Sequence, residues 1–390
     1  MKRRMLRVAL VADTAYDYDR KFVSGVSRYS RQAGNWTIFC EDEHLHQMPS
    51  LARWHGDGVI VQLENPAIHR AIARLKIPVV GVASLANLSP VLDKIVCVSI
   101  DNRKLGERGA AHLLECGFES FGYCGVPATP LNGWSKERAH AFSDFVTRAG
   151  YRCSTYTGRH RTARHWDALQ NHLAAWLQSL KLPVGVMACD DPRARHVLEA
   201  CRRLGLRVPE DVAVLGVDND VPICELCNPP LSSIETGIRE VGFEAAAALD
   251  RLMAGRGPRR TRTVVPPGRL VARRSTDILT VPHEQVAAAL RFIRDHATQR
   301  IQVLDVCRQV GVSRSTLDNR FRQVIGRTTH DEIERVRLNI AKSLLENTDL
   351  PLRIIAAKSG YQNEQYMCRV FRRGLGRTPG QYRQVTSDHA

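Results

Sequence analysis

The chain has 390 residues, of which 44% are hydrophobic and 25% are charged, a composition typical of globular proteins with two or three domains. It contains no run of eighteen apolar residues and no N-terminal segment of the signal-peptide kind, so we expect a cytoplasmic protein with no membrane partner. Eleven scattered cysteines fit a reducing compartment. Cys224 and Cys227 have no partners at zinc spacing and are interpreted as two packed cysteines, so we expect neither metal nor cofactor.

The formal net charge of +16 is distributed unevenly along the chain. Residues 1–250 hold 30 Lys and Arg against 28 Asp and Glu, whereas residues 283–390 hold 18 against 11. Between them, residues 251–276 hold eight arginines and no acid. A solvated basic face is the ordinary explanation of such a run, but concentrated positive charge favours a polyanionic partner. Charge alone therefore predicts nucleic-acid binding by the last third of the chain.

Up to about residue 276, short apolar runs alternate with segments of helical period. The runs are LRVALVA, GVIV, IPVVGVA, VCVSI, SFGYCGV, VGVMAC and VAVLGVD. Apolar strands separated by helices predict doubly wound parallel sheets of the α/β class, in which ligands bind outside the carboxyl ends of the strands. Asp13, Asp190 and Asp218 follow such strands. Because Asp191 precedes Pro192, it is predicted to be a helix N-cap, which leaves Asp190 and Asp218 as the stronger ligand candidates.

Three segments of this region resemble the LacI/GalR regulators and the periplasmic sugar-binding proteins: DDPRARHVLEACRRLGLRVPEDVAVLGVDND, WSKERAHAFSDFV and VPPGRLVARRST. The resemblance implies that residues 1–276 form a two-lobed sensor, with a hinge and a sugar effector in the cleft between the lobes. The candidate ligand-binding residues are Asp13, Tyr16, Tyr18, Asp19, Trp134, Arg138, Asp190 and Asp218. Carboxylates and a guanidinium can pair with vicinal hydroxyls, and aromatic rings can stack on a sugar, although ordinary packing is an equal alternative for each aromatic.

After a linker over residues 277–282, one pattern occurs twice. GVSRSTLDNRFRQVIGRT begins at Gly311, and GYQNEQYMCRVFRRGLGRT begins at Gly360. Each copy predicts a helix-turn-helix, over about residues 303–325 and 352–373, and the segment EIERVRLNIAKSLLEN between them predicts a long connecting helix. This arrangement would hold two reading helices at one fixed spacing.

The helical period separates inner from outer positions in each predicted reading helix. Leu317 and Phe321 in the first copy, and Met367 and Phe371 in the second, are expected to face inward. The residues predicted to contact DNA are Ser313, Ser315, Thr316, Asp318, Asn319, Arg322, Gln365, Arg369 and Arg372. Gln and Arg can read adenine and guanine through paired hydrogen bonds in the major groove.

The C-terminal region, residues 283–390, is similar to the AraC/XylS family of DNA-binding domains. IAAKSGYQNEQYMCRVFRRGLGRTPGQYR follows the family signature nearly position for position, with Met367-Cys368 where Tyr-Phe is frequent. The resemblance implies an all-α domain whose two helix-turn-helix motifs enter successive major grooves on one face of double-stranded DNA.

A LacI-like sensor followed by an AraC-like reader resembles the xylose-responsive transcription regulators. The landmarks YDR, GDGVI, RARH, GVDN, ARRST and GVSRSTLDNRF extend this resemblance along essentially the whole chain. It implies a homodimeric activator of sugar-catabolism genes that binds D-xylose and tandem operator sites and contacts RNA polymerase; another pentose, a hexose or a polyol is the alternative effector. An enzyme is disfavoured because GxxxxGK[ST], GxSxG and HExxH do not occur and no GxGxxG follows the first strand.

Overall fold

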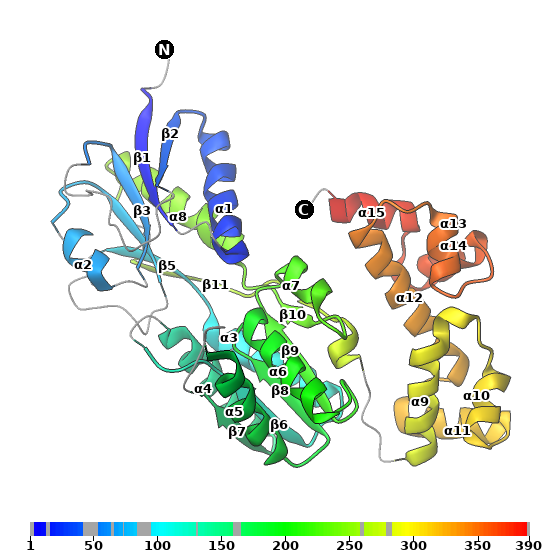
Figure 1. The fold of residues 1–390 in the computed structure, drawn as a ribbon. Helices are drawn as coiled ribbons and strands as arrows, with labels where there is room; N and C mark the ends of the chain where they lie inside the picture. Colours follow the sequence, from blue (N-terminus) through cyan, green and yellow to red (C-terminus); the bar gives the residue numbers. More distant parts are fainter. Residues whose placement is uncertain are drawn as a thin grey trace. The chain divides into compact units, whose positions relative to one another are not determined.

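The computed structural model describes residues 4–12, 16–41, 54–63, 66–72, 74–83, 95–129, 132–158, 165–257, 261–277 and 283–387. The chain divides into two compact units, Met1–Ile278 and Leu279–Ala390 (Figure 1). The first is an α/β unit and the second is built from helices. Within the described ranges, no helix is long and apolar enough to cross a bilayer.

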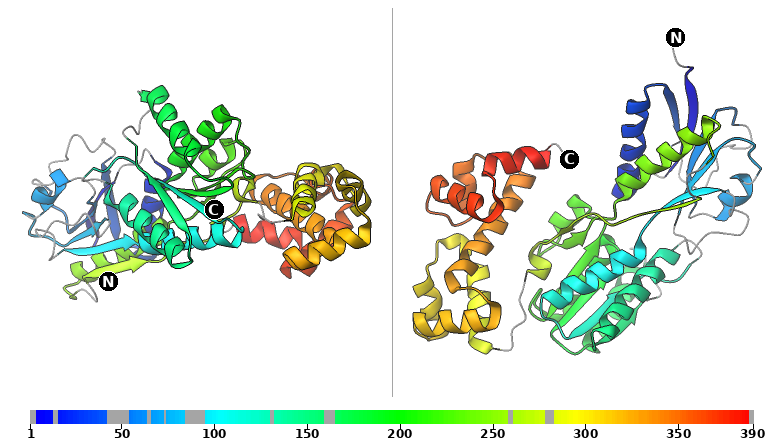
Figure 2. Two further views of the ribbon diagram at one scale, coloured as in Figure 1. Left: turned by 90° about the horizontal axis from the view of Figure 1, so that it is seen from below. Right: turned by 180° about the vertical axis from the view of Figure 1, so that it is seen from behind.

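The first lobe of the α/β unit contains a six-stranded parallel sheet in the order β11-β5-β4-β3-β1-β2. Its strands are β1 (Leu6–Val11), β2 (Trp36–Glu41), β3 (Gly58–Gln62), β4 (Val79–Val82), β5 (Val96–Ile100) and β11 (Arg262–Val265). Its helices are α1 (Asp17–Ala33), α2 (Pro66–Ile72) and α8 (Ile238–Met253). Helices α1 and α8 lie side by side, although more than two hundred residues separate their first turns (Figure 2).

The second lobe repeats this plan with the order β12-β10-β9-β8-β6-β7, in which only β12 is antiparallel to its neighbour among the strand pairs of the described residues. The strands are β6 (Ser120–Cys124), β7 (Arg152–Tyr156), β8 (Val184–Ala188), β9 (Val212–Val217), β10 (Ser232–Ile234) and β12 (Leu270–Val271). Helices α3 (Asn102–Glu115) and α4 (Gly133–Arg148) cover one face, and α5 (Trp166–Gln178) and α6 (Asp191–Leu204) the other (Figures 1 and 2).

All seven apolar runs of the sequence form strands, and the predicted doubly wound class is confirmed. The central strands β3, β4, β5, β8 and β9 are buried along their whole length. Continuous burial explains why their sequences are uniformly apolar, because helices cover both faces of each sheet. The strands without a strong apolar run, such as β2 and β7, lie at the edges of the sheets.

Three connections among the described residues pass between the lobes: β5 to α3, β10 to α8, and β11 to β12. Two of them are joined by backbone hydrogen bonds, from Glu235 N to Arg269 O at 3.0 Å and from Gly268 N to Glu235 O at 2.9 Å. The amide of Asp101, at the third, donates to Val265 O at 2.9 Å. The two lobes are therefore linked by three neighbouring connecting segments, and such a narrow connection allows the lobes to move about a hinge.

The arginines between residues 251 and 276 are partly used inside the α/β unit. Arg273 donates to Glu225 Oε1 at 2.9 Å and its side chain is only 9% exposed. Arg269 pairs with Glu235, and Arg262 donates to the carbonyl of Ile95. These residues hold segments of the α/β unit together, so the basic run is not simply a surface for a polyanion.

The C-terminal unit contains α9 (Glu284–His296), η6 (Ala297–Gln299), α10 (Val303–Val310), α11 (Arg314–Ile325), α12 (Thr329–Asn347), α13 (Leu352–Lys358), α14 (Glu364–Leu375) and α15 (Pro379–Ser387). It has two apolar cores, one around Phe321 under α9 to α11 and one around Phe371 under α13 to α15, and α12 contributes side chains to both. Burial of the α12 side chains on two successive cores makes this helix the common support of the two halves.

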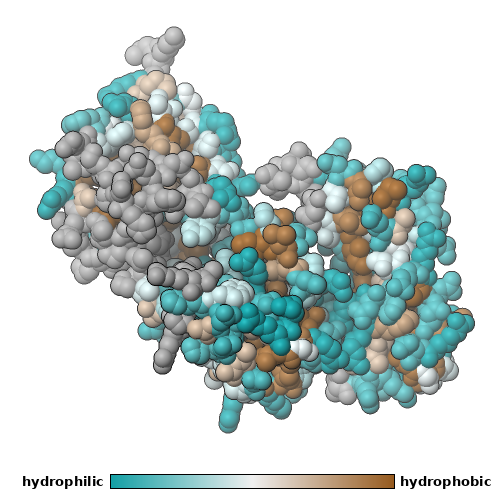
Figure 3. Space-filling view, in the orientation of Figure 1, coloured by the Kyte–Doolittle hydropathy of each residue, from teal (hydrophilic) through white to brown (hydrophobic). Residues whose placement is uncertain are grey.

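Apolar side chains are also found at the surface of the α/β unit. Figure 3 shows a brown area over α7 (Val221–Leu226). Leu226 is 81% exposed and Val221 is 39% exposed. This short helix therefore presents apolar surface to solvent in the single chain.

Candidate ligand site and candidate DNA interface

Arg138 lies at the carboxyl edge of the second-lobe sheet and is 3% exposed. Its Nε donates to Asn102 Oδ1 at 2.9 Å and its Nη1 donates to the carbonyl of Cys189 at 2.5 Å. The guanidinium carbon lies 4.7 Å from the centre of the Trp134 ring, one turn earlier on α4. Arg138 is thereby held between α3, α4 and Cys189 after the end of β8. Cys189 directly precedes Asp190 in the chain.

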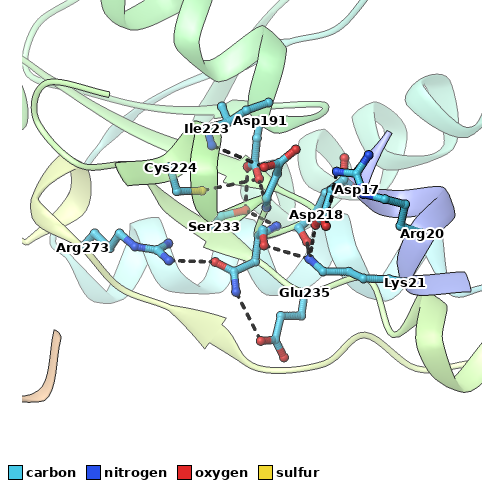
Figure 4. A network of polar contacts seen from close by, with 12 residues as sticks. Asp17, Arg20, Lys21, Asp191, Asp218, Ile223, Cys224, Ser233, Glu235 and Arg273 are labelled. Carbon is cyan, nitrogen blue, oxygen red and sulfur yellow. Dashed lines mark hydrogen bonds and ion pairs between the residues drawn. The ribbon is translucent and has the colours of Figure 1, made fainter. Parts of the chain in front are cut away.

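The prediction that Asp191 caps α6 was wrong, because Asp190 is the cap. Asp190 Oδ1 accepts from the amide of Arg193 at 2.7 Å. Asp191 is fully buried instead, and accepts from the Ser233 hydroxyl at 2.6 Å, the Asp220 amide at 2.8 Å and the Cys224 thiol. The Asp-Pro pattern misplaced the helix start by one residue, and Asp191 has a structural role that ties β10 and α7 to α6 (Figure 4).

Asp218 follows β9 and stands in an unusual backbone conformation. Its φ is 109° and that of Asn219 is 48°, which non-glycine residues rarely adopt. Burial raises the pKa of Asp218 well above its ordinary value; the charge of Arg138 lowers it, and the charges of Asp191 and Asp190 raise it further. Arg138, Asp190 and Asp218 were predicted from separate segments of the sequence. The charges of Arg138 and Asp190 affect the pKa of Asp218, so the three residues lie near one another at a single edge of the sheet.

The predicted residues of the first lobe are less uniform. Asp19 is 8% exposed and accepts from Gln62 Nε2 at 2.5 Å, at the end of β3. Tyr18 packs partly against the core, whereas Tyr16 is 65% exposed at the start of α1. Asp13 lies outside the described residues. Among the residues that the structure describes, Asp19 and Gln62 thus contribute polar groups to the first lobe's edge.

Sequence reasoning missed several polar residues at these edges. Asn102 is 3% exposed, accepts from Arg138, and donates to Glu137 Oε2 at 2.9 Å. It follows β5 almost directly, so the strand-end rule that selected Asp190 could have found it. Lys21 on α1 binds the carbonyls of Asp218 and Asn219 (Figure 4), and no local pattern signals a contact across nearly two hundred residues.

No group of three or more His, Cys, Asp or Glu in the described part of the chain is arranged to hold a metal ion. Cys224 and Cys227 are both buried, and Cys224 donates to Asp191. The described polar edges combine carboxylates, amides and the guanidinium groups of Arg138 and Arg193, which suits them to hydrogen bonding with a neutral polar molecule.

Both predicted reading helices in the C-terminal unit are present. Ser313 caps α11 through the amide of Thr316, and Asn363 caps α14 through the amide of Tyr366. The predicted inner residues Leu317, Phe321, Met367 and Phe371 are all buried. The exposed residues from the predicted DNA-contacting set are Ser313, Ser315, Asn319, Arg322, Gln365, Arg369 and Arg372.

Two members of the predicted set differ from the rest. Asp318 was placed on the solvent-facing stripe, but its side chain is only 16% exposed. Its Oδ1 accepts from the amide of Thr329 at 3.1 Å, and Oδ2 lies 3.8 Å from Arg314. Its carboxylate thus binds the first turn of α12. Thr316 is half-buried, and its hydroxyl lies 2.8 Å from that of Ser313.

The two helix-turn-helix halves are fixed to each other by polar contacts from α12. Arg337 is 8% exposed and donates from Nε to the carbonyl of Ala297 at 3.0 Å and from Nη2 to that of Ile301 at 2.8 Å. Its Nη1 lies 3.8 Å from Glu334, which is 4% exposed. Because α12 also packs on α13 and α14, these bonds fix the first half relative to the second.

The fold and both candidate sites define a periplasmic-binding-protein-like sensor joined to a helix-turn-helix reader. Family models match this description in three parts: an XylR N-terminal domain over residues 7–103, a periplasmic binding protein-like domain over 110–276, and a helix-turn-helix domain over 306–385. The protein is thus a transcription regulator in class.

Curated relatives match over nearly the whole chain. The chain is 36% identical to the xylose operon regulatory protein of Escherichia coli K12, over 98% of each chain. It is 32% identical to the protein of the same name from Haemophilus influenzae, over 98% of this chain and 99% of the relative. A solved structure titled as the xylose-binding transcription activator XylR is 36% identical, with a TM-score of 0.75 and 99% of both chains covered. The chain belongs to the family of xylose operon regulatory proteins.

Proposed function

We propose that this protein is a D-xylose-responsive transcription activator that binds the sugar between its lobes and reads DNA with α11 and α14. The observation that carries the sugar site is the arrangement of Arg138, Trp134, Asp190 and Asp218 at one sheet edge. The names of the full-length relatives support xylose as the sugar.

The chemistry of the proposed site suits a polyol. Arg138 is fixed by Asn102 and Cys189, so its N–H groups have one orientation, and an oriented guanidinium distinguishes hydroxyl positions on a ring. Asp218 follows β9 at the same edge, and the oxygens of its carboxyl group can accept hydrogen bonds from hydroxyl groups. Asp19 and Gln62 supply the opposing edge from the first lobe.

Ligand binding can change the protein only if the sugar contacts the two lobes differently in their open and closed arrangements. A pentose held by Arg138 and Asp218 on one side and Asp19 on the other would favour closure about the three connections. The response is then transmitted to the DNA-binding unit, in a homodimer that contacts RNA polymerase, as the family resemblance implies.

In the DNA-binding unit, Gln365, Arg369 and Arg372 recur along one exposed side of α14, and Ser315, Asn319 and Arg322 along one side of α11. These two sets differ in chemistry, so the proposed operator half-sites differ in base sequence. Arg337 and Glu334 keep the two sets at one separation, which suits successive major grooves on one face of the duplex.

Calorimetry of the full chain tests the sugar site. We expect D-xylose to bind more tightly than D-ribose, L-arabinose, D-glucose or xylitol. We also expect D218N to weaken xylose binding about tenfold or more, because it replaces a carboxyl oxygen of the proposed site with an amide nitrogen. D144N, an exposed substitution on α4, is the matched control and should leave affinity unchanged. Equal affinity for D218N and D144N would contradict the proposed site, and a preference for another sugar would replace xylose as effector.

Selection of binding sequences from a random duplex library tests the DNA interface. N319A and R369A should each relax base preference in a different half-site, at a cost of about 1–3 kcal/mol at the affected position. Each variant controls for the other. A uniform loss at every position would assign both residues to phosphate contacts instead.

The proposed absence of catalysis and the proposed cytoplasmic, dimeric state are tested separately. Incubating the purified protein with each sugar should leave the sugar unchanged, and any turnover would favour an enzyme. Sedimentation should give the mass of two chains, and fractionation should place the protein with the soluble cell contents.

A further inference from the structure

The ammonium group of Lys21 connects the two lobes. Lys21 Nζ donates to Asp218 O at 3.0 Å and to Asn219 O at 2.8 Å, and it pairs with Asp17 Oδ2 at 2.7 Å (Figure 4). Lys21 and Asp17 lie on α1 of the first lobe, whereas the two carbonyls follow β9 of the second. An ammonium has three protons, so these three acceptors match its full capacity to donate.

The turn that supplies the carbonyls is itself rigid. Asn219 donates from its amide to Ser233 Oγ at 3.0 Å, accepts from Arg273 Nη2 at 3.0 Å, and donates from Nδ2 to Glu235 Oε1 at 3.3 Å. These bonds hold the positive φ angles of Asp218 and Asn219, a conformation that persists only where surroundings impose it. The two carbonyl groups are therefore presented together, ready for one cation.

We propose that Lys21 is a latch between the lobes and a positioning residue for the sugar site. Opening about the three connections separates Lys21 from both carbonyls, whereas its bond to Asp17 lies within α1 and survives. The latch thus forms only when the lobes are together. Lys21 donates a hydrogen bond to the backbone carbonyl of Asp218. Because the carboxyl group of Asp218 is part of the proposed sugar site, this inference rests on the proposed function.

The latch affects sugar affinity through the population of the closed state. The apparent dissociation constant equals the intrinsic constant divided by the fraction of chains that are closed. Removing two hydrogen bonds to a charged donor lowers that fraction, and bonds of this kind change equilibria by about tenfold to a hundredfold. Lys21 therefore sets how readily the sensor responds without having to touch the sugar.

Calorimetry with D-xylose and the full chain is the first test. K21M should weaken binding about tenfold or more and should speed sugar release. R20M is the matched control, because Arg20 is the neighbouring cation and lies 3.8 Å from the same Asp17; it should leave affinity unchanged. K21R, which keeps the charge and the donors, should bind xylose more tightly than K21M.

The distance between the lobes without sugar is the second test, and it also serves if K21M binds no sugar. Spin labels at the exposed positions 31 on α1 and 202 on α6, attached without cysteine chemistry, report this distance by pulsed electron resonance. K21M should shift the distribution toward open arrangements relative to wild type and R20M. If K21M and R20M give the same distances and the same xylose affinity, the latch is refuted.

The two proposals can fail separately. If D218N leaves xylose affinity unchanged while K21M still opens the lobes, the sugar site is wrong and the latch stands. If D218N weakens xylose binding while K21M matches R20M in both measurements, the sugar site stands and the latch is wrong.

Discussion

The two turn glycines of the DNA-binding unit allow a sharp test of its packing. Gly311 and Gly360 occupy equivalent positions in the two helix-turn-helix motifs, and their φ angles, 68° and 81°, are both in the left-handed region. They differ in their surroundings. A Cβ added at Gly311 would meet nothing within 4 Å, whereas one added at Gly360 would lie 2.1 Å from Ala297 O and 3.0 Å from the Thr298 Cα.

The magnitude follows from this difference. Alanine in a left-handed conformation costs about 1 kcal/mol, and this cost applies to G311A and G360A alike. At Gly360 the backbone around Ala297 must also move, which adds about 2 kcal/mol of overpacking. The same carbonyl accepts from Arg337 at 3.0 Å, so its displacement also weakens the contact between the two halves. We expect G360A to lose about 3 kcal/mol in total.

Calorimetric unfolding of the full chain, together with DNA binding, measures both variants. The transition of the C-terminal unit should fall by roughly 10 °C in G360A and by a few degrees in G311A. Xylose binding should be unchanged in both, because neither glycine belongs to the α/β unit. Equal losses in the two variants would refute the argument from close contact, since only the shared backbone cost would then remain.

Three further predictions concern caps, a buried arginine and pH. S313A and N363A should each cost about 1 kcal/mol of unfolding free energy in denaturant titrations, because each removes the cap of a reading helix; no loss would show that the caps are dispensable. R193M should destabilise the α/β unit by about 3 kcal/mol, because the guanidinium, buried and bonded to two backbone carbonyls, is replaced by a group that cannot donate; a loss confined to the other calorimetric transition would contradict this. Burial raises the pKa of Asp191 to about 7 and lowers that of His112 to about 4. Because the pKa of Asp191 is raised in the folded state, its contribution makes the stability fall as pH rises toward 7. Because the pKa of His112 is lowered in the folded state, its contribution makes the stability fall as pH drops from 6.5 to 4. The two effects oppose each other in the wild type, so unfolding temperatures of D191N should fall on acidification and those of H112Q should fall as pH rises; similar profiles for both variants would contradict the assignment.

Much of the reading helices could be predicted because their signals are local. Ser313 and Asn363 are good caps, and Leu317 and Phe321 repeat at helical spacing, so start and inner face follow from neighbouring residues. Asp318 was misplaced because its position on the helix looked exposed, and only the approach of α12 turned its carboxylate toward the Thr329 amide. A contact with another element leaves no trace in the helical period.

In the sensor, the sequence by itself determined the alternation of buried strands and helices, since apolar runs bounded by polar helices fold in few other ways. It also selected Asp190 and Asp218, because strand ends in such sheets meet at one edge, whereas Arg138 on α4 was selected by the family resemblance. Only the tertiary structure decided that Asp190 caps α6 while Asp191 is buried, and that Lys21 bonds to carbonyls 197 and 198 residues away. The physical reason is that hydrogen bonds between the lobes depend on which backbone segments come together in space. The residues around a lysine on a helix do not show whether it bonds to a distant carbonyl or is solvated.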